Sequence, residues 1–179
     1  MIEEHSWYQV VDCEVLQQGD LIDSCPIAIP CSAIKEDTIV DFKVREHDIV
    51  IMSQSCDLVP RKNGKPKLEF VVVCFVWFLD DFVSTYPNYN SPGSKERLRC
   101  GYQPAFHLLN KCEIEGFTRD FLVVDFRQIF SIPFSSLAEI ARERDSRLRL
   151  LTPYREHLSQ AFARYFMRVG LPSDIPPFK

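Results

Sequence analysis

The sequence predicts an α+β fold, in which a small antiparallel β-barrel carries a C-terminal helix packed on it. Three observations lead to this class. The first three-quarters of the chain contain short apolar or alternating runs between turn residues, as β-strands do. The last quarter shows helical spacing of apolar residues between start and stop signals. The length fits one domain, 1–179, with the barrel over about 8–134.

The first strands are expected between a turn at Gln17–Ile22 and the apolar run Phe70–Leu79. Thr38–Val44 alternates apolar and polar residues, and 49–53 is a short apolar run typical of a buried strand. The dipeptide Asn63-Gly64 is a strong hairpin-turn signal. We therefore expect 49–53 and 70–79 to pair as an antiparallel hairpin.

The middle of the chain is expected to form a long loop followed by the last strands. Residues 84–104 contain three prolines, two glycines and two asparagines, which favours a loop that is functional or mobile. Strands are expected at Ala105–Leu109 and Phe121–Phe126, and Ile129–Phe134 ends the strand region.

Two helices are expected after the strands. Ser136 and Glu139 have the spacing of a capping box, which predicts a helix over about 136–144. Thr152 suits the N-cap and Pro153 the first helical position of a second helix over about 153–169, and Gly170 follows as a stop signal. We expect the tail 171–179 to be extended. The apolar positions of the second helix share one face: Tyr154, Leu158, Ala161, Phe162, Tyr165, Phe166 and Val169.

Charge is distributed unevenly along the chain. Residues 1–60 hold 12 acidic and 3 basic residues, whereas 61–179 hold 13 acidic and 18 basic residues, which together give the net charge of −4. The densest basic stretch, Arg142–Arg168, contains seven arginines. These arginines could form a solvated helical face, pair with the acidic N-terminal third, or offer a surface to anions.

Cysteine usage and hydropathy predict a cytoplasmic protein with free thiols. The seven cysteines are odd in number and form no CxxC pair, so we expect no disulfide framework and no metal site. The longest apolar run has 10 residues, whereas a membrane helix needs about 20. The acidic N-terminus lacks the pattern of a signal peptide. No nucleotide-binding, zinc-protease or hydrolase motif is present, and we expect no cofactor.

The first candidate site is Ser53–Asp57, where small polar residues follow a buried strand. Gln54 and Ser55 are candidate binding residues, and Cys56 is a candidate nucleophile beside Asp57. A nucleophilic thiol needs a base, which only the tertiary fold could supply, from His47, His107 or His157. The neighbouring carboxylate disfavours the thiolate, so a strand-ending turn or a binding role is the stronger interpretation.

The second candidate site is a polar stripe on the last helix. At 100° per residue, four side chains lie together beside the apolar face, and we expect them to contact a partner: His157, Gln160, Arg164 and Arg168. The arginines offer paired donors to carboxylate or phosphate groups. The alternative is that they pair within the molecule and fix the helix in place.

The order of these elements resembles the PemK/MazF-like toxin fold, a small SH3-like barrel. The resemblance rests on Gly19–Ile22, Ile49–Ser53, Val71–Phe78, and Asp125–Ile129 before Leu137. It implies a toxin–antitoxin endoribonuclease that binds RNA. The toxins carry a catalytic Arg-Pro pair where this chain has His47-Asp48, and a Thr or Ser where it has Trp77-Phe78, so the ribonuclease site is not carried over.

The segments Ser53–Asp57 and Tyr154–Arg164 are also similar to segments of uncharacterised bacterial proteins, which implies no activity. Our leading hypothesis is therefore a non-enzymatic binding or adaptor domain, whose basic helix stripe faces a protein or nucleic-acid partner. A toxin-like ribonuclease with an altered site is the alternative, and a Cys56-dependent enzyme is a third hypothesis.

Overall fold

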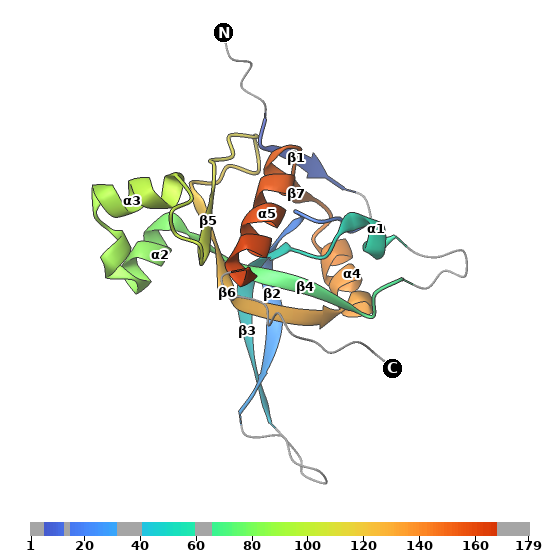
Figure 1. The fold of residues 1–179 in the computed structure, drawn as a ribbon. Coiled ribbons are helices and arrows are strands. Elements are labelled where there is room, and N and C mark those ends of the chain that lie inside the picture. Colours follow the sequence, from blue (N-terminus) through green and yellow to red (C-terminus); the bar gives the residue numbers. More distant parts are fainter. Residues whose placement is uncertain (1–5, 13–14, 32–40, 60–65, 168–179) are drawn as a thin grey trace, which may run out of the picture.

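The computed structural model describes residues 6–12, 15–31, 41–59 and 66–167. Within these ranges the protein is an α+β fold with antiparallel sheets and a C-terminal helix, as predicted (Figure 1). The strands are β1 (Tyr8–Val11), β2 (Leu21–Pro30), β3 (Phe42–Ile51), β4 (Phe70–Phe78), β5 (Phe106–Leu109), β6 (Leu122–Pro133) and β7 (Arg147–Leu150). The helices are α1 (Ser55–Leu58), α2 (Leu79–Thr85), the 3₁₀ turn η1 (Pro87–Tyr89), α3 (Pro92–Arg99), α4 (Phe134–Glu143) and α5 (Tyr154–Phe166).

The strands form an open five-stranded sheet and a separate pair. The sheet has the order β2-β3-β4-β6-β5, and β1 pairs with β7. Single contacts join the two: Asp20 forms an isolated bridge with Arg149, and the Tyr8 hydroxyl donates a hydrogen bond to the Asn110 carbonyl over 2.7 Å. No continuous ladder connects these sheets in the described residues, so the closed barrel of our prediction is not confirmed.

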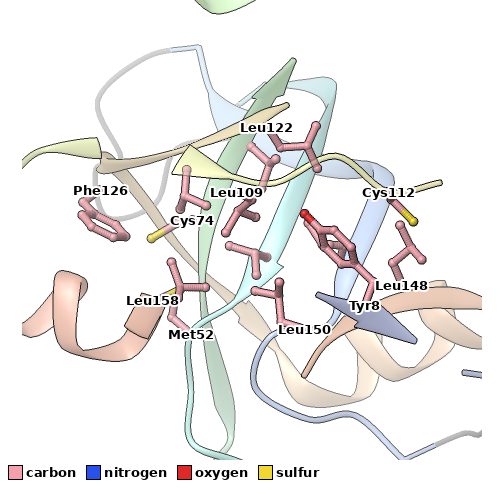
Figure 2. Packing of buried hydrophobic residues seen from close by; sticks show 14 residues of the cluster. Tyr8, Met52, Cys74, Leu109, Cys112, Leu122, Phe126, Leu148, Leu150 and Leu158 are labelled. Carbon is pink, nitrogen blue, oxygen red and sulfur yellow. The ribbon is translucent and has the colours of Figure 1, made fainter. Parts of the chain in front are cut away.

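The predicted central hairpin is confirmed in its pairing. β3 and β4 are antiparallel, with Val50 opposite Cys74. Alternate residues face opposite sides of this pair, because side chains alternate along a strand. Cys74 faces a core that includes Leu158 of α5 (Figure 2), whereas Val73 faces a second core with Leu137 of α4. Helices therefore cover both faces, which explains the continuous apolar run of β4. The predicted turn at Asn63-Gly64 lies outside the described residues.

The long loop predicted over 84–104 is wrong. This region contains the end of α2, then η1 and α3, which lie together at one end of the sheet (Figure 1). Pro87 and Pro92 stand at the first positions of their helices, where proline fits, and the Ser91 hydroxyl accepts the Ser94 N–H over 3.1 Å as an N-cap. Buried Leu98 attaches α3 to the body of the domain.

The two C-terminal helices are present, but their starts differ from the prediction. α4 begins at Phe134, directly after β6, so Ser136 does not cap it. α5 begins one residue after Pro153, and the Thr152 hydroxyl bonds to the Glu156 carboxylate over 3.1 Å instead of capping the backbone. α5 is described as helical to Phe166. Residues 168 and 169 of the predicted helix and the tail 171–179 lie outside the described residues.

Two strands were not predicted, β1 and β7. β7 falls in the basic stretch that one interpretation treated as a helical face, and all four of its residues are buried. The expected free thiols are present at the six described cysteines, while Cys13 lies outside the described residues. No helix in the described ranges combines the length and apolarity needed to span a membrane.

Candidate functional site

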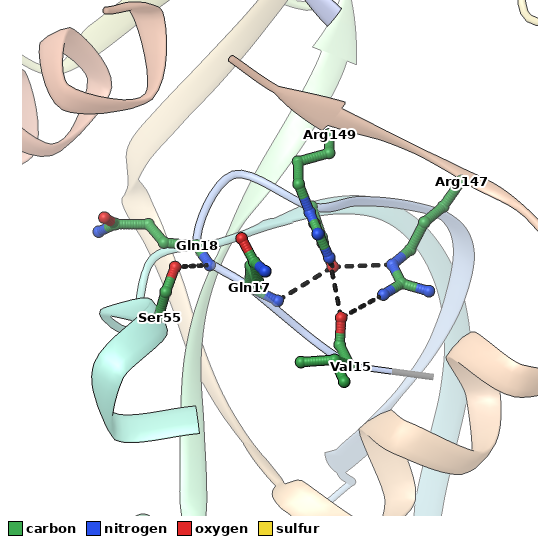
Figure 3. Close-up of polar contacts among 7 residues, drawn as sticks. Val15, Gln17, Gln18, Ser55, Arg147 and Arg149 are labelled. Carbon is green, nitrogen blue, oxygen red and sulfur yellow. Dashed lines mark hydrogen bonds and ion pairs between the residues drawn. The ribbon is translucent and has the colours of Figure 1, made fainter. Parts of the chain in front are cut away.

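A buried ion cluster fixes the loop that leads to the candidate site. The Asp20 carboxylate, which has no solvent exposure, accepts hydrogen bonds from Arg147 over 2.8 Å and from Arg149 (Figure 3). Both guanidinium groups also donate to the Val15 carbonyl, over 2.9 and 2.8 Å. Charge-assisted bonds between planar guanidinium groups and a carboxylate are short and directional, so β7 is held against the start of β2. The predicted pairing of basic residues with the acidic N-terminal third is confirmed for these two arginines.

The same cluster orients the turn at 17–20. The Gln17 N–H donates to Asp20 over 3.1 Å, and Gly19 has a φ of +84°, which glycine adopts without strain. A Cβ at Gly19 would lie 3.1 Å from the Leu150 Cβ, so the close approach of the turn to β7 also requires glycine. The turn directs Gln18 toward α1 and α5.

Gln18 connects the turn to the segment Ser53–Asp57. Its backbone N–H donates to the Ser55 hydroxyl over 3.1 Å (Figure 3). Its side-chain amide donates to the Met52 carbonyl over 2.7 Å and, more weakly, to the Ser159 hydroxyl of α5 over 3.4 Å. Gln18 therefore bridges the end of β3 and the last helix.

The segment Ser53–Asp57 ends β3 and forms the short helix α1. The Ser53 hydroxyl accepts the Val72 N–H over 2.9 Å, which attaches the segment to β4. Lys67 holds its other side, because its ammonium donates to the Cys56 carbonyl over 2.5 Å and lies 3.9 Å from the Asp57 carboxylate. Gln54 and Cys56 are exposed. Much of the segment is thus fixed by neighbours, while Gln54 remains exposed.

A groove of about 480 Å³ lies between this segment and α5. Its polar lining consists of amides, hydroxyls and one carboxylate: Gln18, Ser53, Gln54, Asp57 and Ser159. Its apolar lining is Met52, Leu68, Val72, Phe162 and Ala163. The groove thus combines uncharged hydrogen-bonding groups with an apolar wall, and Asp57 is the single ionisable residue among those that line it.

The basic stripe lies on the other flank of α5. His157, Gln160 and Arg164 are exposed, and at 100° per residue they lie about 100–160° around the helix axis from Ser159. His107 of β5 lies close to this flank, since the charges of His157 and Arg164 contribute to lowering its pKa. Arg168 lies outside the described residues. We call His107, His157 and Arg164 the basic flank.

The two candidate sites predicted from the sequence are therefore separated by α5. The groove brings Gln54 and Asp57 together with α5, but through Ser159 and Phe162 and not through the stripe. Ser55 acts inside the scaffold as the acceptor for the Gln18 N–H.

Cys56 has no histidine base in the described structure. Its thiol donates to the Gln54 side-chain oxygen over 3.7 Å. His47 instead stacks on Phe75 at 3.9 Å between ring centroids, and His157 packs against Tyr154. The geometry therefore gives the thiol no partner that could remove its proton. No three His, Cys, Asp or Glu side chains of the described ranges lie close enough together to hold a metal ion.

Two polar residues of the groove, Gln18 and Ser159, were not predicted, and His107 was considered only as a base for Cys56. Gln18 stands in a turn, Ser159 within a helix, and His107 on a strand whose partner residues on β6 lie 13 or more positions further along the chain. No local pattern marks any of them, since each acquires its role from a contact between distant segments. Phe162 was predicted as a core residue, and it also lines the groove.

No family model matches this sequence, and neither a curated protein nor a solved structure matches it. The groove and the basic flank are therefore the features of the molecule that bear on its function.

Proposed function

We propose that this protein is a non-enzymatic binding domain that uses α5 to recognise a protein partner, with an extended segment of that partner in the groove. The chemistry of the groove lining carries the proposal. An extended peptide offers backbone N–H and C=O groups along its length, and amide and hydroxyl side chains can pair with both. The apolar wall suits one or two apolar side chains of the segment.

The charge of the groove favours a peptide over a nucleic acid. Asp57 would repel a phosphate backbone, whereas nucleic-acid sites gather lysine and arginine. Its pairing with Lys67 is loose, at 3.9 Å between two side chains that are each more than 40% exposed. Exposed pairs of this kind contribute little, so Asp57 is available to a basic residue of the partner.

Filling the groove tests the proposal. Peptides that bind the full chain are first selected from a random peptide library, and their affinity is then measured for Ser159→Trp. The bulky ring should occupy the groove and weaken binding at least about tenfold, or about 1.4 kcal/mol. Ser136→Trp, on an exposed face of α4, is the matched control and should bind as the wild type does. Equal binding by both variants would contradict the proposal.

The toxin-like alternative is tested separately. A PemK/MazF-like barrel remains a prediction from the order of the elements, and the ribonuclease activity that it implies needs a catalytic set other than that of the toxins. Incubation of the full chain with RNA, with Arg164→Gln as the comparison, addresses this alternative. Cleavage that is lost in Arg164→Gln would favour a ribonuclease over a binding domain.

A further inference from the structure

The basic flank is built around a histidine that packs between β6 and α5. The His107 ring lies parallel to Phe126, with 6.4 Å between centroids and 21° between planes. Phe126 in turn meets Phe162 and Tyr165 of α5 at 5.4 and 6.1 Å. Phe126 begins an irregular stretch of β6, because Cys74 pairs with Ile129 while the next residue, Phe75, pairs with Asp125. The irregularity places Phe126 under α5 and His107 at its edge.

His107 lies in an environment that disfavours its positive charge. Its Nε2 atom is buried and has no hydrogen-bond partner in the described structure. Burial, with a smaller contribution from the charges of His157 and Arg164, lowers its pKa to about 4. Both neighbours come from α5, and no carboxylate contributes to this shift. Three groups that can each carry a positive charge therefore gather here.

We propose that the basic flank is a second binding site for the same protein partner, and that it takes carboxylate side chains of an acidic segment. This inference rests on the proposed function. The groove and the basic flank lie on opposite sides of one helix, so a segment that crosses α5 reaches both. Arg164 supplies a planar fork of donors that matches a carboxylate, and His157 adds a further donor when it is protonated. An acidic peptide is favoured over RNA because three basic groups are few for a phosphate backbone and the chain is acidic overall.

Binding at this site is coupled to the protonation of His107. A bound carboxylate opposes the repulsion from His157 and Arg164, and so favours the charged imidazole. Anion binding and the protonation of His107 are linked equilibria. An anion that raises the His107 midpoint by one pH unit therefore binds about tenfold more tightly to the protein with His107 protonated than to the protein with His107 neutral.

The test uses hexa-aspartate as the probe and the imidazole Cε1–H resonances of the full chain as the readout. Aspartate side chains have a pKa of about 3.9, so about half of the probe's carboxylates are ionised at pH 4 and most of them at about pH 5, where the raised His107 midpoint is expected. The His107 resonance is assigned by its loss in His107→Phe. We expect saturating hexa-aspartate to raise the His107 midpoint by at least one pH unit. An unchanged titration curve would overturn the inference.

Arg164→Gln is the key variant, because Arg164 is exposed and its loss should leave the fold intact. It should weaken hexa-aspartate binding at least tenfold. In the free protein it should raise the His107 midpoint, since it removes a neighbouring positive charge. A role of Arg164 in the scaffold alone would leave hexa-aspartate binding unchanged and would overturn the inference.

Two further measurements separate this inference from the proposed function. Ser159→Trp should bind hexa-aspartate as the wild type does, because the groove lies on the other flank. If the selected peptides bind Ser159→Trp as tightly as the wild type while Arg164→Gln weakens hexa-aspartate binding, the groove proposal is wrong and the basic-flank inference is supported. If a uridine oligonucleotide binds through Arg164 more tightly than hexa-aspartate does at the same salt concentration, the acidic-peptide assignment is overturned.

Discussion

Arginines from one basic stretch of the sequence have opposite roles in the structure. Arg147 and Arg149 are 4% and 5% exposed and converge on Asp20, whereas Arg164 is exposed on α5 and makes no ion pair among the described salt bridges. The side chains are chemically identical, and all three lie within 18 residues. The difference comes from what each segment meets: β7 meets a buried carboxylate and the Val15 carbonyl, while this flank of α5 meets solvent and a neutral histidine.

The comparison shows that Arg147 and Arg149 are structural because a carboxylate is buried with them, whereas Arg164 lies in solvent and pairs with no buried carboxylate among the described salt bridges. A buried guanidinium needs a partner because leaving water is costly for a charge. An exposed guanidinium keeps its hydration and contributes little to folding. The predictions below test this division, beginning with the largest effect on the free energy of unfolding.

Removing the shared carboxylate should have the largest effect. Asp20→Asn leaves two buried guanidinium groups without a counter-charge, and we expect it to lower the free energy of unfolding by about 3–5 kcal/mol. Urea denaturation followed by far-UV circular dichroism measures the loss. Asp57→Asn, at a half-exposed and loosely paired carboxylate, is the control and should cost under about 1 kcal/mol. Similar losses of unfolding free energy in Asp20→Asn and Asp57→Asn would contradict the division between buried and exposed charges.

The attachment of α5 should depend on its apolar face and not on its charges. Leu158 is fully buried in the core shared with β3 and β4, so Leu158→Ala should cost about 2–5 kcal/mol. Urea denaturation is again the measurement, with Gln160→Ala on the exposed face as the control. A loss below about 1 kcal/mol for Leu158→Ala would mean that charged contacts hold the helix.

His107 should make the protein less stable in acid. Its pKa is about 4 in the folded protein, against 6.5 for the ordinary side chain. Between these values the unfolded chain binds a proton that the folded protein does not, so stability is lost as the pH falls from about 6.5 toward 4. The loss should be on the order of 2–3 kcal/mol. His107→Phe keeps a ring against Phe126 and should remove this part of the pH dependence of the melting temperature. If the melting temperatures of the wild type and of His107→Phe changed equally with pH, the acid sensitivity could not be assigned to His107.

Reversing the exposed charge should have the smallest effect on folding. Arg164→Glu should change the free energy of unfolding by less than about 1 kcal/mol, while binding of an acidic partner segment weakens by at least about 2 kcal/mol. Thermal melting and hexa-aspartate binding on the same variant give both values. A fall in melting temperature of several degrees with unchanged binding would place Arg164 with the structural arginines.

The strands and helices that carry strong local patterns could be predicted from the sequence. The pairing of β3 with β4 follows from two apolar runs around a turn signal, and α5 follows from its apolar spacing. The failures lie where tertiary contacts overrule a weak pattern. The helices within 84–104 contain residues that are typical of turns. Ser91 and Pro92 instead start α3, because Leu98 of this helix packs into a hydrophobic core.

The candidate sites show the same limit. From the sequence, Gln54, Asp57 and the stripe of His157, Gln160 and Arg164 could be selected, because residue type and helical phase are local properties. The packing of α5 against β3 and β4 decides how these residues are arranged. It places Gln54 and Asp57 across a groove from α5, and it puts the stripe on the other flank of that helix.

The sequence by itself determined the α+β class with antiparallel strands, the central hairpin, the last helix and the residue types that can bind a partner. Only the tertiary structure decided which arginines are buried, since Arg147 and Arg149 meet Asp20 across more than 120 residues of chain. It also placed His107 beside Arg164, and Gln18 against Ser159. The physical reason is that backbone periodicity depends on neighbours within a few residues, whereas burial and charge pairing depend on segments that only the folded core brings together.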